Sequence, residues 1–194
     1  NAKLFGIFDG KGDIDKKTRE LAKTMIYAVL YGAGARKLGT ILDFSLSEHE
    51  QQELGRETID TFYKNLPAIK KLKDKVDERV VQRGYLTGID GRHLQIRSRH
   101  SALNQLLQST GAIAVKKATC ILYKDLHLAK LKWGCHYAFV AHIHDEIQAI
   151  VKPQHVSVYK DLAIKSFEKA GEFFDLKCPL TGEAKEGKNW METH

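Results

Sequence analysis

The stretch YAFVAHIHDEIQAIV, from Tyr137 to Val151, places two adjacent carboxylates, Asp145 and Glu146, in the middle of an apolar run. Charged side chains are rare in such surroundings unless a site needs them. The apolar residues on both sides predict two short strands, with His144 and Asp145 at or near the turn between them. Adjacent carboxylates repel one another unless a cation neutralises them, and Mg²⁺ prefers one or two carboxylates together with substrate phosphate oxygens. The stretch therefore predicts a rigid carboxylate hairpin suited to metal-assisted phosphoryl transfer. The alternative is a solvated polar hairpin tip.

A second pattern lies in RELAKTMIYAVLYG, which starts at Arg19. Arg19, Lys23, Tyr27 and Tyr31 recur every four residues, which at ~100° per residue places them on one slowly winding stripe of a helix, ~18 Å long. That length suits a nucleoside triphosphate, with its phosphates beside the two cations and its sugar and base against the two rings. The alternative is an amphipathic helix whose tyrosines pack in the core and whose charges face water.

A third pattern lies within a long helix that is expected from about His100 to Leu126. His100, Asn104 and Gln108 repeat the four-residue spacing and form a polar stripe. Side-chain amides donate hydrogen bonds to the N3 and O2 acceptors that every base pair presents in the minor groove. Such a stripe can follow a DNA duplex without reading its sequence. The alternative is a solvated helix face.

Taken together, these patterns resemble the family A DNA polymerases, the relatives of bacterial DNA polymerase I. RELAKTMIYAVLYG resembles the fingers helix of that family, with R, three residues, K, seven residues and YG. The triplet HDE, at 144–146, resembles its palm hairpin. GYLTGIDGRHLQIRS, HSALNQLLQSTGA and the closing NWMETH resemble further segments of the family. The motifs occur in the family's order, which argues against chance agreement, and their spacing fits the phage replicative branch best.

The resemblance implies a role for each matching residue. For catalysis it indicates Asp145, Glu146 and Lys23, with Asp145 and Glu146 as ligands of the two Mg²⁺ ions of the complete enzyme. For a deoxynucleoside triphosphate it indicates Arg19 and Lys23 at the phosphates, Tyr27 at the sugar, Tyr31 at the templating position, and His144 near the phosphates or the primer end. For primer-template DNA it indicates Tyr31, Gly32, Arg92, His100, Asn104 and Gln108. His100 stands where the bacterial repair branch usually has Arg. Some phage relatives also have His at this position.

The predicted fold class is α+β, with mainly helical fingers and a C-terminal palm portion that carries a small antiparallel sheet, of the right-hand polymerase type and incomplete. The resemblance divides the chain into a fingers region, 1–83, with its nucleotide-binding helix at 18–31, and a C-terminal palm region, 84–194. The periodicity of apolar residues, together with Gly and Pro at element ends, predicts further helices at 48–65, about 67–82, 100–126 and 154–170. It also predicts a short hairpin between Gly84 and Gly91 and the carboxylate hairpin at 137–151. Ser47 and Glu50 form a capping-box pattern at the start of the helix expected at 48–65.

Chemistry by two metal ions needs carboxylates from at least two places around the ions. In the family one such Asp lies in an earlier palm strand, and the opening NAKLFG resembles the segment after that strand. Asp9, Asp13 and Asp15 lie in a loop-like, Gly-rich stretch and are not expected to replace it. The chain, which begins without Met, is therefore expected to be a fragment that is inactive alone and needs the missing N-terminal part of the polymerase as a partner.

Two other function classes stay open at this point. The first is a nucleic-acid-binding module without catalysis. The second, a metal-dependent hydrolase, is less favoured. His142 and His144 form an HxH pair of the kind that binds zinc, but a hydrolase pattern would carry Asp two residues after the second His, whereas Asp145 follows it directly.

The composition agrees with an anionic partner. The 194 residues carry a net charge of +7, and the pI is about 9.2. Cys120, Cys135 and Cys178 form no CxxC pair, which favours reduced thiols and a cytoplasmic location, in a bacterial host or phage-infected cell. No apolar run approaches the ~20 residues of a membrane span, so no membrane role is expected.

Overall fold

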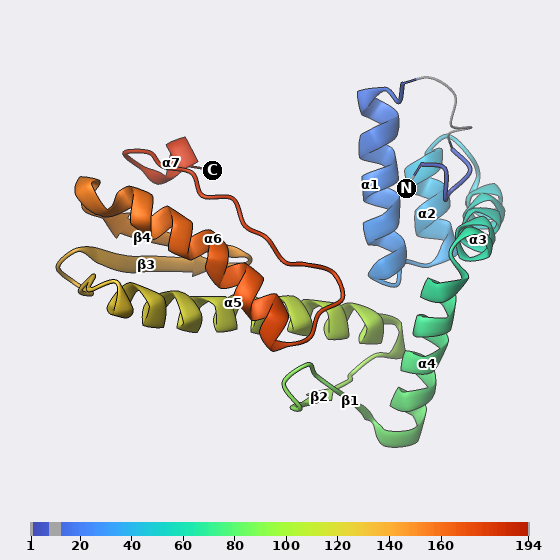
Figure 1. Ribbon diagram of the computed structural model, residues 1–194. Coiled ribbons are helices and arrows are strands. Elements are labelled where there is room, and N and C mark those ends of the chain that lie inside the picture. Colours follow the sequence, from blue (N-terminus) through green and yellow to red (C-terminus); the bar gives the residue numbers. More distant parts are fainter. Residues whose placement is uncertain (1, 8–12, 194) are drawn as a thin grey trace. The chain divides into compact units, whose positions relative to one another are not determined.

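The computed structural model describes residues 2–7 and 13–193. Within these residues the fold is α+β and mainly helical, with two antiparallel sheets of two strands each (Figure 1). The chain divides into two compact units, one formed by 1–87 and 93–107 and the other by 88–92 and 108–194. No helix in the described ranges is long and apolar enough to cross a membrane.

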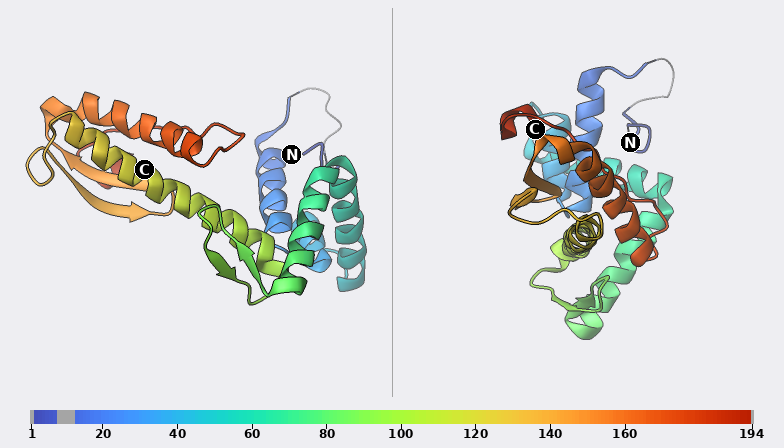
Figure 2. Two further views of the ribbon diagram at one scale, coloured as in Figure 1. Left: turned by 60° about the horizontal axis from the view of Figure 1, so that its bottom comes forward. Right: turned by 60° about the vertical axis from the view of Figure 1, so that its left-hand side comes forward.

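The first unit consists of helices and one short hairpin. In chain order its elements are α1 (Lys16–Leu30), α2 (Ala35–Leu42), α3 (Glu48–Asn65), α4 (Pro67–Arg83), β1 (Tyr85–Thr87), β2 (His93–Gln95) and the 3-10 helix η1 (Arg99–Ser101), followed by the first residues of α5 (Ala102–Leu128). Figure 1 and the two views of Figure 2 show α1, α2 and α3 lying together in this unit.

Local sequence sets the helix ends. At α3 the backbone N–H of Glu50 donates to the Ser47 hydroxyl at 3.4 Å, and the Ser47 N–H donates to the Glu50 carboxylate at 2.9 Å, so the predicted capping box is confirmed. Pro67 occupies the first turn of α4, where a helix needs no N–H donor. Gly84 ends α4 in the left-handed conformation, with φ 75°. The helix expected at 18–31 begins at Lys16, because Asp15 caps it by accepting the Thr18 N–H.

Two apolar clusters stabilise the first unit. One is centred on Phe5, Met25, Leu38 and Phe62, in which the two phenylalanine rings stack with their centroids 4.6 Å apart. The other joins α4 to the β1–β2 hairpin and the start of α5 through Val76, Val80, Leu86, Ala102 and Leu103. Burial of these side chains gives this half of the chain its own hydrophobic core.

Helix α2 is absent from the sequence prediction, and it packs against α3 unusually closely. A Cβ atom on Gly39 of α2 would lie 1.8 Å from the carbonyl oxygen of Gln51. A Cβ on Gly55 of α3 would lie 1.8 Å from the carbonyl oxygen of Ala35. The two helices therefore meet backbone to backbone, and each contributes a glycine where no larger residue fits.

The second unit contains most of α5 together with β3 (Tyr137–Ile143), β4 (Glu146–Val151), the 3-10 helix η2 (Pro153–His155), α6 (Val156–Phe173) and α7 (Trp190–Thr193). Its core gathers Leu122, Leu126, Leu131, Tyr137 and Tyr159, so the β3–β4 hairpin packs against α5 and α6 (Figure 1). The helices expected at 100–126 and 154–170 are confirmed as elements, but a 3-10 turn precedes each of them, and the α-helices run 102–128 and 156–173.

Candidate active site

Helix α1 presents its predicted stripe to solvent. Ala22, Met25 and Val29 are the buried residues of this helix. Arg19 and Lys23 are exposed, and Tyr27 and Tyr31 are 48% and 45% exposed as residues, with ring centroids 5.8 Å apart. The alternative, in which both tyrosines pack in the core, is therefore wrong. The helix offers two cations and then two aromatic rings along one outer surface, the rings being adjacent.

Gly32 and His100 lie against each other where α1 ends. Gly32 has φ 78°, a left-handed conformation that favours glycine, and a Cβ on it would lie 2.1 Å from the His100 carbonyl oxygen. His100 itself belongs to η1 rather than to α5, so regular α-helical spacing begins only after it. The expected helical stripe from His100 to Gln108 is corrected accordingly, since a 3-10 turn rotates each residue farther than an α-helix does.

The other residues that were expected to contact DNA differ in their surroundings. Asn104 of α5 is half-buried, and its side-chain oxygen is buried without a hydrogen-bond partner among the described residues. Gln108, farther along the helix, is exposed and belongs to the second unit. Arg92, at the tip of the β1–β2 hairpin, is held in an ion pair with Asp90 at 2.7 Å. Burial by itself would raise the pKa of the Asp90 carboxyl, but hydrogen bonds from Arg92 keep this pKa below its ordinary value.

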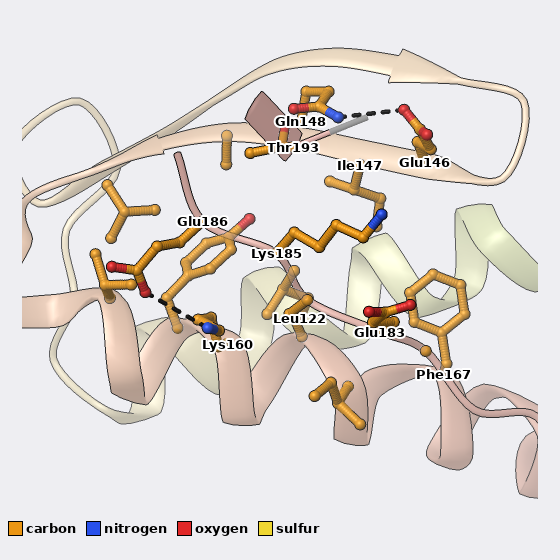
Figure 3. A pocket seen from close by; sticks show the side chains of 18 of the residues that line it. Leu122, Glu146, Ile147, Gln148, Lys160, Phe167, Glu183, Lys185, Glu186 and Thr193 are labelled. Atoms are coloured by element: carbon orange, nitrogen blue, oxygen red, sulfur yellow. Dashed lines mark hydrogen bonds and ion pairs between the residues drawn. The ribbon is translucent and has the colours of Figure 1, made fainter. Parts of the chain in front are cut away.

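A β-bulge in β3 shifts the pairing of the carboxylate hairpin, while β4 alternates without interruption. Phe139 pairs with Ala149 on the side of the core, but the register shifts between Phe139 and Ala141, so that Ala141 pairs with Gln148. Paired residues share a face and neighbours alternate, so Gln148 and Glu146 lie on the face opposite Ala149. Glu146 is half-buried there, and its carboxylate accepts a hydrogen bond from the Gln148 amide at 3.2 Å (Figure 3).

His144 and Asp145 form the two-residue turn that the sequence predicts. Ile143 pairs with Glu146 across it, which closes the hairpin. His144 adopts φ 53°, in the left-handed region that costs an L-residue ~1–2 kcal/mol. Both turn side chains are exposed. Asp145 is thus presented at a tip between two paired strands, which limits its freedom more than a loop would.

A pocket of about 560 Å³ adjoins these carboxylates within the second unit. Its walls come from β4, α6 and the segment 181–187, and Asp145 and Glu146 are among its lining residues. Figure 3 shows Lys185 extending into it and Lys160 paired with Glu186 at 3.4 Å. Tyr159 is 8% exposed as a residue, and its buried hydroxyl has no hydrogen-bond partner among the described residues. Burial raises the pKa of this hydroxyl well above its ordinary value, so Tyr159 stays protonated.

The donor set at the hairpin fits one side of a magnesium site. Asp145 and Glu146 are hard oxygen donors, and Mg²⁺ is commonly bound by one or two carboxylates while it keeps several waters. Among residues 2–7 and 13–193, no group of three or more His, Cys, Asp or Glu side chains is arranged to hold a metal ion. Asp15 is occupied as the cap of α1, with its carboxylate bound to the Thr18 N–H at 2.9 Å. Asp9 lies outside the described residues.

The structure thus collects the predicted residues into two groups. Most of them belong to the first unit, namely Arg19, Lys23, Tyr27, Tyr31, Gly32, His100 and Asn104, and the second unit holds Arg92, Gln108, His144, Asp145 and Glu146. Sequence reasoning missed the pocket residues Tyr159, Lys160, Lys185 and Glu186. Nothing in their local pattern marks them, because the pocket exists only once 181–187 lies beside α6 and β4. Helix α2 had a usable signal, since Leu38 and Leu42 have helical spacing.

The sequence profile of DNA polymerase family A matches residues 2–192. Several phage enzymes named DNA-directed DNA polymerase are similar to the chain over 91% of its length: that of Enterobacteria phage T3 is 34% identical, that of Escherichia phage T7 33%, and that of Escherichia phage Phieco32 38%. The chain spans 27%, 27% and 28% of the lengths of these relatives.

A solved structure has the same fold. The POL domain of Pol1 from M. smegmatis, in complex with DNA primer-template and dNTP, superposes with a TM-score of 0.72 at 18% identity. The match covers 92% of this chain and 30% of that one. Because the family profile extends over almost the whole sequence, the chain belongs to DNA polymerase family A.

Proposed function

We propose that this chain supplies the fingers and the C-terminal palm of a template-directed DNA polymerase. The complete enzyme joins the primer 3′-oxygen to the α-phosphorus of a deoxynucleoside triphosphate and breaks the bond from that phosphorus to pyrophosphate. The proton of the 3′-hydroxyl goes to a general base or to solvent. The observation that carries the proposal is the presentation of Asp145 and Glu146 at the end of a paired hairpin. It is supported by membership of family A and by the polymerase activity for which the phage relatives are named.

The stripe on α1 is proposed as the nucleotide site. Lys23 and Arg19 donate hydrogen bonds to the triphosphate and neutralise charge that develops on the transferring phosphoryl group. Tyr27 packs against the sugar, and Tyr31 takes the templating position, with Gly32 beside it. Their exposure supports these roles, because a ring that is buried in the core cannot receive a ligand.

Asp145 and Glu146 are proposed to hold Mg²⁺, two ions in the complete enzyme. When bound, the metal supplies electrostatic stabilisation of the phosphoryl oxygens. His144 lies next to these carboxylates in the turn and is proposed to contact the phosphates or the primer end. Primer-template DNA is the proposed partner of Arg92, His100, Asn104 and Gln108, in line with the nucleic-acid complex of the solved relative.

The chain alone is proposed to bind DNA without extending a primer. Two-ion chemistry draws carboxylates from at least two places, and Asp145 and Glu146 both come from one hairpin. The remaining carboxylate is proposed to come from the other part of a family A polymerase.

A chimaera tests the proposal. In it, this chain replaces the matching segment of the phage T7 relative, which is 33% identical. We expect Mg²⁺-dependent primer extension by the chimaera and none by the isolated chain. Asp145→Asn should abolish extension, and Lys23→Ala should slow nucleotide incorporation by ~10²- to 10³-fold while DNA affinity stays nearly constant.

The matched control is Lys17→Ala, which removes an exposed cation from the same helix outside the stripe. It should leave incorporation unchanged. If the chimaera is active and Lys23→Ala lowers only its DNA affinity, Lys23 binds the duplex rather than the triphosphate. Extension that survives Asp145→Asn would refute the role of the hairpin.

A further inference from the structure

Helix α4 carries a row of cations that the proposed catalytic function does not use. Lys71, Lys75, Arg79 and Arg83 stand four residues apart, and all four are exposed. At ~1.5 Å of rise per residue, the row is ~18 Å long. It is called the α4 cation row below.

These cations have no ion-pair or hydrogen-bond partner among the described residues, although the helix also contains carboxylates. Asp74 is paired with Lys70 at 2.9 Å and Asp77 with Lys73 at 2.6 Å. Glu78 accepts a hydrogen bond from the Gln82 amide at 3.0 Å. The acidic side chains are therefore engaged by other residues of the same helix, and the α4 cation row keeps its charge available.

The arrangement around the helix axis separates the two kinds of charge. At ~100° per residue, the α4 cation row covers an arc of ~120°, whereas Asp74, Asp77 and Glu78 fall on the neighbouring arc. The buried residues Val76 and Val80 face the core of the first unit. One exposed side of α4 thus carries four cations and no carboxylate, with Leu72 and Gln82 between them, in a chain whose net charge is +7.

We infer that the α4 cation row is a docking surface for the phosphate backbone of duplex DNA. A duplex carries one negative charge per ~1.7 Å of its axis, so a track of evenly spaced cations ~18 Å long meets several phosphates at once. Helix α4 contains no aromatic residue, so it offers no surface on which single-stranded bases could stack. The inference rests on the proposed function, since it takes DNA as the partner, and it adds a contact surface on the fingers.

Two double substitutions on the same helix test it. Lys75→Gln with Arg79→Gln removes two cations from the row, and Lys70→Gln with Lys73→Gln removes two cations that are already paired with Asp74 and Asp77. The 194-residue chain is titrated with a fluorescent duplex of about 20 base pairs at several salt concentrations, and folding is checked by circular dichroism. The row variant should bind ~5- to 30-fold more weakly, and its salt slope should fall by ~2, one unit for each lost phosphate contact.

The control pair should change both quantities much less, and Lys75→Arg with Arg79→Lys should restore binding because the charge is kept. Equal losses in both pairs, or a parent chain that binds no duplex, would overturn the inference. So would stronger, row-dependent binding of a single strand or of an acidic peptide, which would assign the surface to that partner. Extension by the chimaera is a separate readout: its failure beside intact, row-dependent duplex binding would refute the proposed function alone.

Discussion

Asp145 and Glu146 are neighbours in the chain, yet they occupy different environments. Asp145 lies exposed in a two-residue turn, and Glu146 begins β4, where it is half-buried and bonded to Gln148. The turn also forces His144 to φ 53°. Such strain persists only where the surrounding structure imposes it, here through the pairing of Ile143 with Glu146. Backbone pairing therefore fixes where both carboxylates leave the chain, and the Gln148 side chain in addition holds the carboxylate of Glu146.

Tyr159 allows a test at the level of a single atom. Its hydroxyl is buried without a partner among the described residues, and an unsatisfied buried polar group costs ~1–3 kcal/mol. Tyr159→Phe should therefore leave the free energy of unfolding unchanged or raise it by ~1 kcal/mol. Chemical denaturation measures this, and Tyr123→Phe, which removes an exposed hydroxyl from α5, should have no effect. A clear loss of stability in Tyr159→Phe would show that the hydroxyl has a partner in solution.

The same residue gives a pH dependence. Burial raises the pKa of Tyr159 in the folded state above the ordinary value of 10.0. Once the pH exceeds that ordinary value, the unfolded chain releases this proton while the folded chain keeps it, so the stability falls as the pH rises. Chemical denaturation across this pH range measures the fall, which should be smaller in Tyr159→Phe.

Glycine decides the packing of whole elements in the first unit. Gly39 and Gly55 allow α2 and α3 to touch backbone to backbone, since a Cβ on either would come within 1.8 Å of a carbonyl oxygen. In the second unit the bulge after Phe139 has a comparable effect, because it turns the last residues of β3 relative to the core. Each feature is one residue in size and sets the orientation of an entire helix or strand end.

The two helix-crossing glycines can be compared with a glycine in open space. Gly39→Ala and Gly55→Ala should each destabilise the chain by ~1–3 kcal/mol or more, because a backbone must move to accommodate the methyl group. A Cβ on Gly111 of α5 would meet no atom within 4 Å, so Gly111→Ala should stabilise by ~0.5–1 kcal/mol through helix propensity. Thermal unfolding of the three variants measures the contrast. Equal behaviour at all three positions would contradict the close approach of α2 and α3.

On the scale of the whole molecule, the two compact units have cores of their own. The clusters around Phe62 and Val80 belong to the first unit, and the cluster around Leu126 belongs to the second. A chain with separate cores need not unfold in a single two-state transition. The two tryptophans of the sequence, Trp133 and Trp190, both belong to the second unit. Tryptophan fluorescence therefore reports on that unit, while circular dichroism reports on both.

Leu38 and Leu126 are both fully buried, one in each unit, and form a matched pair. Each change to Ala should cost its own unit ~2–5 kcal/mol. Leu126→Ala should lower the midpoint of the fluorescence transition. Leu38→Ala should lower the circular dichroism midpoint and leave fluorescence almost unchanged. A common shift of both signals in both variants would instead show one cooperative unfolding unit.

The sequence by itself determined the helices at α1, α3, α4, α5 and α6, the carboxylate hairpin and the family, because capping residues, proline, glycine and apolar periodicity act over a few neighbouring residues. It also predicted a short hairpin after Gly84, but the second strand, His93–Gln95, lies beyond the predicted end at Gly91. Within the site, it determined which residue types stand at the spacing of the family motifs. It located the turn at His144 and Asp145, since two apolar runs flank it. The roles of these residues stay proposals.

Only the tertiary structure decided the rest. Gly39 fits against Gln51, and Gly32 against His100, although they are far apart in the sequence, and no local pattern records such a meeting. The bulge after Phe139 changes which β3 residues lie opposite Gln148 and Glu146, and strict alternation along β3 does not foresee it. The pocket beside Tyr159 depends on where the segment 181–187 lies after folding. Contacts of this kind follow from the packing of distant segments, and their free energy is gained only when those segments meet.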